Sequence, residues 1–200
     1  MIGNNHHLDP IAGEDFQMFE QDLPGQNSSG LSFQTASALP LESCITMNDS
    51  WGFKINDRNY KSYTNIIQTL VGAAGRNSNL LLNVGPMANG EIQVECRDTL
   101  ALVGKWVKKY GASIYSTRGG PLSPQLWGVT TQDAKHVYVH LMKQRNQSGL
   151  FIPGNFKVKK VGIMGTVSSL PFSIRQNGVL IDTRGLSLTG PDTIIAIDFQ

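Results

Sequence analysis

The sequence predicts an α/β region followed by an all-β region, and three observations support this division. Apolar residues recur at helical spacing in two segments of the first half, at 63–74 and 100–110. Each of these segments follows a short apolar run that is typical of a strand. After Gly119-Gly120-Pro121 the pattern changes to short alternating strands separated by turns. We therefore expect two domains, residues 1–118 and residues 119–200.

Residues 1–40 are expected to be mostly loop, because no periodic pattern runs through them and glycines and prolines interrupt them repeatedly. A first strand is expected at 43–46. A helix should follow, because apolar side chains share one face at Tyr63, Ile66, Ile67, Leu70, Val71 and Ala74.

A second strand–helix unit comes next. The run 79–84 is expected to be a strand buried on both faces, and Gly85-Pro86 should end it. Gly111 is expected to cap the following helix, whose shared face carries Leu100, Val103, Val107 and Tyr110. Two consecutive strand–helix units imply a parallel sheet.

The C-terminal region reads as a small antiparallel β-sandwich. Residues 135–141 alternate in polarity, and Asn177-Gly178 is a turn signal. We expect six or seven strands between Leu126 and Phe199.

The first domain is too small to close a barrel. A (β/α)8 barrel has eight strand–helix units and typically about 250 residues, whereas residues 1–118 supply two clear units and a long loop. We therefore expect the C-terminal part of a (β/α)8-type catalytic barrel that belongs to a longer enzyme, followed by the β-sandwich.

Composition excludes several classes of function. The chain carries a formal charge of +2, and its longest basic cluster, 157–160, is interrupted by a valine, so a nucleic-acid interface is not expected. No apolar run approaches the roughly 20 residues that span a bilayer, and the first residues do not resemble a secretory leader. Cys44 and Cys96 lack the spacing of a metal site or a disulfide framework and are expected to be buried free thiols.

Acids and a tryptophan gather in the segments between the expected elements. Glu14, Asp15 and Glu20 lie in a Gly/Pro-rich stretch, Glu42 precedes Cys44, and Trp51 lies in the turn Ser50-Trp51-Gly52-Phe53. Carboxyl groups placed on loops beside an aromatic ring suggest chemistry on a sugar.

Several of these segments resemble one enzyme family. They are 15–20 (DFQMFE), the turn 51–53 (WGF), 79–86 (NLLLNVGP) with Asn89-Gly90, and 105–115 (KWVKKYGASIY). Together they are similar to the C-terminal half of α-L-fucosidases of glycoside hydrolase family 29. The resemblance implies a retaining glycosidase that removes terminal α-linked L-fucose from glycans without a cofactor.

The resemblance also implies roles for single residues. A retaining mechanism needs two carboxyl groups about 5 to 5.5 Å apart, a nucleophile and an acid/base. Glu20 matches the acid/base of the family, with Glu42 as its rival, and Glu14 and Asp15 should orient the loop. The nucleophilic aspartate of the family lies upstream of the segment that this chain matches, so we expect the chain to be inactive by itself.

Trp51 is expected to lie under the apolar face of fucose, or else to pack in the core. Asn5, His6 and His7 are expected to hydrogen-bond sugar hydroxyls, because many family members carry an arginine in the corresponding loop and this chain has none there. Adjacent histidines without an acidic partner at a known spacing do not predict a metal site.

Two further interpretations remain open. The β-sandwich could be a non-catalytic carbohydrate-binding module, which would require exposed coplanar aromatic rings on one sheet face; the candidates are Trp127, Tyr138, Phe151, Phe156, Phe172 and Phe199. Alternatively, residues 120–200 only brace the barrel. The expected partner is a fucosylated oligosaccharide or glycoconjugate, and such a function suits a periplasmic or extracellular location.

Overall fold

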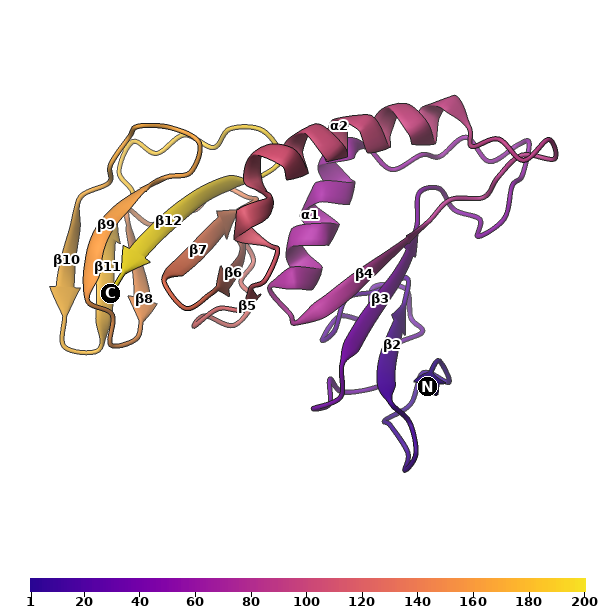
Figure 1. Ribbon diagram of the computed structural model, residues 1–200, viewed down its shortest axis with the longest axis horizontal. Helices are drawn as coiled ribbons and strands as arrows, with labels where there is room; N and C mark the ends of the chain where they lie inside the picture. Colours follow the sequence, from indigo (N-terminus) through magenta and orange to yellow (C-terminus); the bar gives the residue numbers. More distant parts are fainter. The chain divides into compact units, whose positions relative to one another are not determined.

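The computed structural model describes residues 1–200, which form two compact units (Figure 1). One unit comprises residues 1–73 and 77–105, and the other comprises 74–76 and 106–200. This division by packing falls inside the second long helix, whereas the division by fold class expected from the sequence falls between residues 118 and 119. No helix is both long and apolar enough to cross a membrane.

The first unit contains a four-stranded sheet whose strands are all parallel and follow the chain order. The strands are β1 (Gly3–Asn4), β2 (Phe16–Glu20), β3 (Leu41–Thr46) and β4 (Ser78–Asn83). Helix α1 (Tyr63–Ala74) joins β3 to β4, and α2 (Val94–Tyr110) follows β4. The expected parallel sheet is confirmed, but β1 and β2 lie where the sequence predicted loop.

The sequence pattern did not predict strand β2, because one of the buried residues of this strand is polar. Gln17 is fully buried. Its amide nitrogen donates to Gln34 Oε1 at 2.9 Å and to the carbonyl of Thr35 at 2.8 Å, and its Oε1 accepts from the backbone N–H of Ser37 at 2.9 Å. Hydrogen bonding thus offsets the cost of burying a polar group at a position where an apolar residue would have marked a strand.

The two faces of this sheet differ. Ile45 and Leu80 point to the face that packs against Ala73 of α1. Cys44 and Leu81, which pair in register, point to the opposite face, where Leu81 is 45% exposed. The prediction that residues 79–84 are buried on both faces is therefore wrong, because the helices of this unit cover only one face of β4.

The ends of the two helices have different causes. Ser62 begins α1, because its hydroxyl accepts the backbone N–H of Asn65 at 3.2 Å in the manner of an N-cap. Gly111 does not cap α2 in a left-handed conformation, so that prediction is wrong; the chain continues into the short helix η1 (Gly111–Ser113). A Cβ on Gly111 would lie 2.8 Å from the ring of Tyr115, so close packing explains this glycine.

The second unit contains two antiparallel sheets around one core. One sheet has the order β5-β6-β7-β12-β9 and the other has the order β10-β11-β8. Residues of both sheets, such as Val139, Ile195, Ile152 and Ile181, form a single buried cluster. The strands are β5 (Arg118–Gly119), β6 (Gly128–Gln132), β7 (His136–Leu141), β8 (Gly149–Pro153), β9 (Val158–Ile163), β10 (Phe172–Arg175), β11 (Gly178–Asp182) and β12 (Thr193–Phe199).

A fully buried His140–Asp192 pair ties this unit together. His140 Nδ1 lies 2.7 Å from Asp192 Oδ2, and both side chains have no exposed surface. His140 Nε2 lies 3.1 Å from the hydroxyl of Thr131, which donates its single hydrogen to the carbonyl of Ser113 at 2.6 Å. The Thr131 oxygen must therefore accept from His140 Nε2, and a proton is shared between His140 Nδ1 and the Asp192 carboxyl group.

We expect His140→Leu to lower the free energy of unfolding of this unit by about 3 to 5 kcal/mol, because it leaves Asp192 buried without its partner. Calorimetry on His140→Leu, on Asp192→Leu and on the double variant measures the effect. The double variant should be less destabilised than the sum of the two single changes. Additive losses would show that no free energy couples the pair.

Candidate active site

The carboxyl ends of the parallel strands bring Glu20 together with three of the residues singled out in the sequence. Glu20 is the last residue of β2. Its Oε1 accepts the indole N–H of Trp51 at 3.1 Å, and its Oε2 accepts the side-chain amide of Asn5 at 3.3 Å. His7 Nε2 lies 3.6 Å from the same Oε2. The side chains of Glu20 and His7 are 23% and 28% exposed, so this cluster is accessible but partly desolvated.

Trp51 is held by the loop that follows β3. In this loop Asp57 Oδ2 accepts three donors: the side-chain amide of Asn48 at 2.8 Å and the backbone N–H groups of Asp49 at 3.1 Å and Ser50 at 2.8 Å. Burial alone would raise the pKa of Asp57, but these hydrogen bonds and one from the backbone N–H of Asn59 outweigh it and lower the pKa. The Asp57 carboxylate therefore fixes the residues that precede Trp51.

The end of β4 supports the same loop from the other side. Asn83 donates its side-chain amide to the carbonyl of Trp51 at 2.7 Å and to the hydroxyl of Thr46 at 3.0 Å. Gly85 packs directly on the loop, since a Cβ there would lie 2.6 Å from the carbonyl carbon of Gly52 and from the nitrogen of Phe53. The sequence predicted that Gly85 ends the strand, and in the structure both Asn83 and Gly85 support the loop that carries Trp51.

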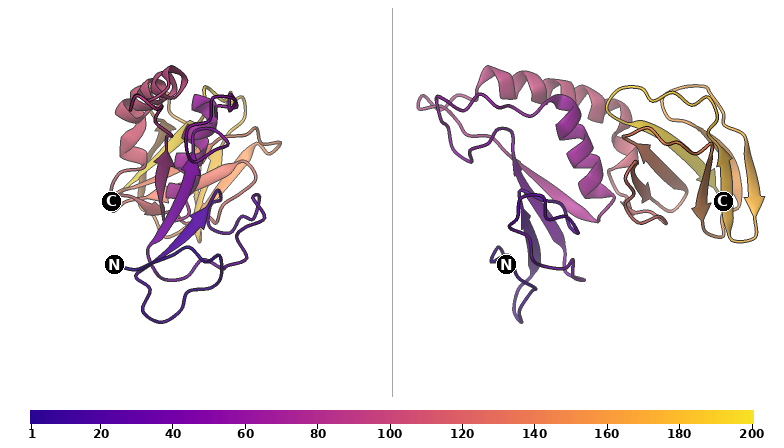
Figure 2. Two further views of the ribbon diagram at one scale, coloured as in Figure 1. Left: turned by 90° about the vertical axis from the view of Figure 1, so that its right-hand side faces the viewer. Right: turned by 180° about the vertical axis from the view of Figure 1, so that it is seen from behind.

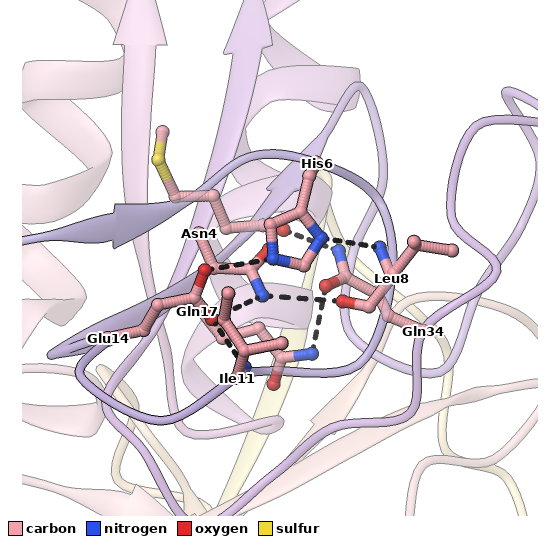
Figure 3. A network of polar contacts seen from close by, with 8 residues as sticks. Asn4, His6, Leu8, Ile11, Glu14, Gln17 and Gln34 are labelled. Carbon is pink, nitrogen blue, oxygen red and sulfur yellow. Dashed lines mark hydrogen bonds and ion pairs between the residues drawn. The ribbon is translucent and has the colours of Figure 1, made fainter.

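Figure 3 shows the polar network that shapes the loop after β1. Glu14 Oε2 accepts from the side chain of Asn4 and from the backbone N–H of Ile11, each at 2.9 Å, and Glu14 Oε1 lies 2.8 Å from His6 Nε2. Burial alone would raise the pKa of Glu14, but these partners outweigh it and lower the pKa. Glu14 thus orients the loop, in line with its expected role.

The two histidines have separate surroundings. His6 Nδ1 accepts the backbone N–H of Leu8 at 3.3 Å, so its Nε2 carries the hydrogen that points to Glu14. Both ring nitrogens of His6 are therefore engaged within the loop. His7 instead faces Glu20; its backbone φ is 63°, and its Nδ1 is buried without a hydrogen-bond partner. Histidine adopts this left-handed conformation more readily than most residues, and such strain often accompanies function.

Glu42, the alternative candidate for the acid/base, lies farther from the carboxyl edge of the sheet than Glu20 does. It pairs in register with Met18, whereas Glu20 pairs with Cys44 two residues nearer the carboxyl edge. The thiol of Cys44 points to Glu42 Oε1 at 3.7 Å. Burial, the charge of Glu42 and that of Glu20 raise the pKa of Cys44 to about 11, so Cys44 remains a thiol and is not a nucleophile at neutral pH.

The sequence analysis did not identify Asp57 and Thr46, whose hydrogen bonds support the loop that carries Trp51. Asp57 lies six residues after Trp51 in a polar loop, and no motif connects it to partners that precede it in the chain. The structure gathers no group of three or more His, Cys, Asp or Glu side chains that could hold a metal ion. The cluster around Glu20 therefore offers one carboxyl group, an aromatic ring, a side-chain amide and an imidazole.

Comparison with known proteins identifies relatives of this chain. A family model described as alpha-L-fucosidase matches residues 1–112. Plasma alpha-L-fucosidase of Homo sapiens is 28% identical over 163 residues, which cover 74% of this chain and 34% of that protein. Alpha-L-fucosidase of Dictyostelium discoideum is 27% identical and is covered to 33% of its length. The chain therefore spans about a third of the length of these curated relatives.

Solved structures give the same relationship. Alpha-L-fucosidase isoenzyme 1 from Paenibacillus thiaminolyticus superposes with a TM-score of 0.75 at 30% identity, over 93% of this chain and 45% of that chain. A GH29 alpha-L-fucosidase from Bacteroides thetaiotaomicron gives a TM-score of 0.74 at 20% identity, over 93% and 43% of the two chains. The second likeness is one of fold alone.

We expect Asp57→Ala to release the loop that carries Trp51 and to shift the Trp51 indole N–H resonance at neutral pH. In the native protein the same shift should occur only in acid. Because the folded pKa of Asp57 lies below its ordinary value of 3.8, its stabilisation is complete above that value and is lost as the pH falls through the folded pKa. NMR titration measures both effects. Asp49→Ala is the control, because that carboxylate accepts only from the side chain of Asn59; an unchanged Trp51 resonance in Asp57→Ala would contradict this role.

Gly85→Ala should lower the free energy of unfolding by about 1 to 3 kcal/mol, because the added methyl group overlaps rigid backbone at Gly52 and Phe53. Gly52→Ala should change it little, since a Cβ there meets nothing within 4 Å. Thermal unfolding of the two variants makes the comparison. Equal stability of both variants would show that the contact is not tight.

Proposed function

Because this chain belongs to the alpha-L-fucosidase family, we propose that it forms the acid/base side of a retaining α-L-fucosidase site. The substrate would be a terminal α-L-fucosyl residue on an oligosaccharide or glycoconjugate. Glu20 would protonate the oxygen of the leaving group and then deprotonate the water that attacks the glycosyl-enzyme intermediate.

The position of Glu20 carries this proposal. It lies at the carboxyl end of β2, and ligands of parallel α/β sheets bind outside the carboxyl ends of the strands. Its two oxygens receive hydrogen bonds from different strand ends, through Asn5 and Trp51, so its orientation is fixed from both sides. Glu42, which pairs with Met18, is set back from this edge and suits a supporting role.

The neighbours of Glu20 suit a sugar. Trp51 is 38% exposed while its indole nitrogen is engaged, so its ring can lie against the apolar face of fucose, which includes the C6 methyl group. Asn5 and His7 approach the same carboxylate and are placed to hydrogen-bond sugar hydroxyls. His6 would act through Glu14 as part of the loop and not through the sugar.

The nucleophile is proposed to come from outside these 200 residues. A retaining mechanism requires a second carboxylate about 5 to 5.5 Å from the acid/base. The carboxylates of Glu14 and Asp57 accept loop hydrogen bonds, and Glu42 accepts the thiol of Cys44 on the neighbouring strand. We therefore expect the chain to bind but not to hydrolyse fucosides by double displacement unless the missing carboxylate is supplied.

A structural neighbour supports the retaining route. The Bacteroides thetaiotaomicron alpha-L-fucosidase has been crystallised as a trapped covalent intermediate with 2-fluoro-fucosyl fluoride. A covalent glycosyl-enzyme intermediate is the signature of double displacement. We extend this route to the protein that carries the present chain, and we expect it to act in the periplasm or outside the cell, where fucosylated glycans are accessible.

The second candidate, a carbohydrate-binding sandwich, has weaker support. Phe151 and Phe172 are the exposed aromatic residues of its strands, at 43% and 38%. Phe172 pairs with Ile181, and Phe151 pairs with the adjacent residue Leu180. Since successive residues of a strand point to opposite faces, the two rings cannot form one coplanar platform. We therefore do not favour a sugar-binding role for this sandwich.

We expect Glu20→Gln to lower the turnover of an aryl α-L-fucoside by about a hundredfold or more in the protein made from its native gene. Aryl leaving groups need little acid assistance, so the loss should fall mainly on the second step. Added azide should then attack the glycosyl-enzyme, restore the rate and give α-fucosyl azide with net retention, which a rate assay with product NMR detects.

Glu42→Gln is the matched control, because that carboxyl group lies on the neighbouring strand of the same sheet. It should retain activity within a few-fold and show no response to azide. Azide rescue of Glu42→Gln in place of Glu20→Gln would move the acid/base to Glu42. A native protein that hydrolyses no fucoside would overturn the proposed function.

A further inference from the structure

The two most exposed apolar side chains of the second unit lie in ordered turns. Leu126 is 95% exposed and Val167 is 98% exposed. Two backbone hydrogen bonds between Gln125 and Gly128, at 2.8 and 3.2 Å, close the turn that carries Leu126. A backbone hydrogen bond of 3.1 Å, donated by the last residue of β9, closes the loop that carries Val167. The fold therefore holds both aliphatic side chains in water, at turn positions that polar residues usually occupy.

These two apolar tips lie at the same end of the five-stranded sheet. Leu126 precedes β6, and the start of β6 pairs with the end of β7. The start of β12 pairs both with the end of β7 and with the end of β9, which Val167 follows. Strands β6 and β9 are three strand spacings apart, or about 14 Å. In Figure 1 the loops after β9 and before β12 emerge at one end of this unit, and Figure 2 shows them from behind.

Two exposed lysines lie beside the tips. The backbone N–H of Lys143 donates to the carbonyl of Trp127 at 3.0 Å, which places Lys143 next to the turn of Leu126. Lys109 contacts the loop of Val167, since a Cβ on Gly165 would lie 3.0 Å from Lys109 Cε. Each tip therefore has a positive charge close to it.

No free carboxylate opposes these lysines at this end of the unit. Residues 120–127, 142–148 and 164–171 contain no acidic residue. Asp192, which precedes β12, is buried against His140, and Asp182, which ends β11, is paired with Arg184. The end of the sandwich thus combines apolar tips with uncompensated positive charge.

The second unit as a whole is strongly basic, although the chain is nearly neutral. This unit contains twelve Lys and Arg residues and four Asp and Glu residues, a formal charge of +8. The first unit contains five basic and eleven acidic residues, a formal charge of −6. The charge of +2 for the whole chain conceals this division. A negatively charged surface therefore attracts the second unit.

We propose that this end of the sandwich binds the surface of an anionic lipid membrane, with Leu126 and Val167 as its tips and Lys109 and Lys143 beside them. The tips enter the boundary between headgroups and acyl chains, and the lysines meet the lipid phosphates. A nucleic acid or an anionic polysaccharide would attract the lysines but offers no apolar layer to the tips. This site is independent of the proposed function, because it uses no residue of the cluster around Glu20.

The test measures sedimentation of the protein made from its native gene with two kinds of vesicle. One kind is pure phosphatidylcholine, and the other is an equal mixture of phosphatidylcholine and phosphatidylglycerol. We expect binding to the mixed vesicles and about tenfold or more weaker binding to the neutral ones. Lys109→Gln/Lys143→Gln should weaken binding to the mixed vesicles by about tenfold or more. Leu126→Ser and Val167→Ser should each weaken it about three- to tenfold, because serine gains little from an apolar layer.

Lys135→Gln and Ile174→Ser are the matched controls. Both residues are exposed, and they lie toward the opposite end of the unit, ahead of β7 and near the end of β10. Both variants should bind like the native protein. All of these variants should hydrolyse an aryl α-L-fucoside as the native protein does, since none of the changed residues lies in the first unit.

Two results would overturn the membrane assignment. One is a native protein that binds neither kind of vesicle. The other is binding that Leu126→Ser and Val167→Ser retain at native strength and that double-stranded DNA competes away, which would show a merely cationic surface. Because sedimentation is read without hydrolysis, a protein that cleaves no fucoside would refute the proposed function and leave this test intact.

Discussion

The candidate site depends on the common direction of four parallel strands. Because the strands run the same way, their carboxyl ends meet at one edge of the sheet, and residues distant in the sequence meet there. Glu20 ends β2, Asn5 follows β1 and Asn83 ends β4. A slip of one residue in the pairing of β2 with β3 would turn Glu20 to the face that packs against α1 and would dismantle the cluster.

Three carboxylates without a proposed catalytic role order the loops around this edge by accepting hydrogen bonds. Glu14 organises the loop after β1, Asp57 the loop after β3, and Asp22 accepts backbone N–H groups from Ser28 and Ser29 at 3.0 Å each. Burial alone would raise the pKa of Asp22, yet these hydrogen bonds and those of the two serine hydroxyls lower it. Loops of this length have few apolar contacts, so charge-assisted hydrogen bonds replace a core as the source of order.

Sequence patterns predicted the parts of the fold that rest on apolar periodicity. The helix at 63–74, the parallel sheet and the seven strands between residues 126 and 199 were recognisable because apolar side chains mark their buried faces. Strands β1 and β2 were not, since one is two residues long and the other buries Gln17. For the site, the resemblance suggested Glu20, Trp51, Asn5 and His7, which the structure brings together. The support by Asp57 could not be predicted, because it arises from the path of a loop.

Strand β4 has a consequence for the behaviour of this chain in solution. It pairs only with β3, and its segment Ser78–Asn83 contains neither a charged residue nor a proline. Natural sheets normally protect such a border with lysine, proline or a bulge, because its free amide and carbonyl groups can recruit another strand. The six residues SNLLLN have none of these protections. Expressed alone, this polypeptide is therefore expected to depend on chaperones during synthesis and to lose solubility as its concentration rises.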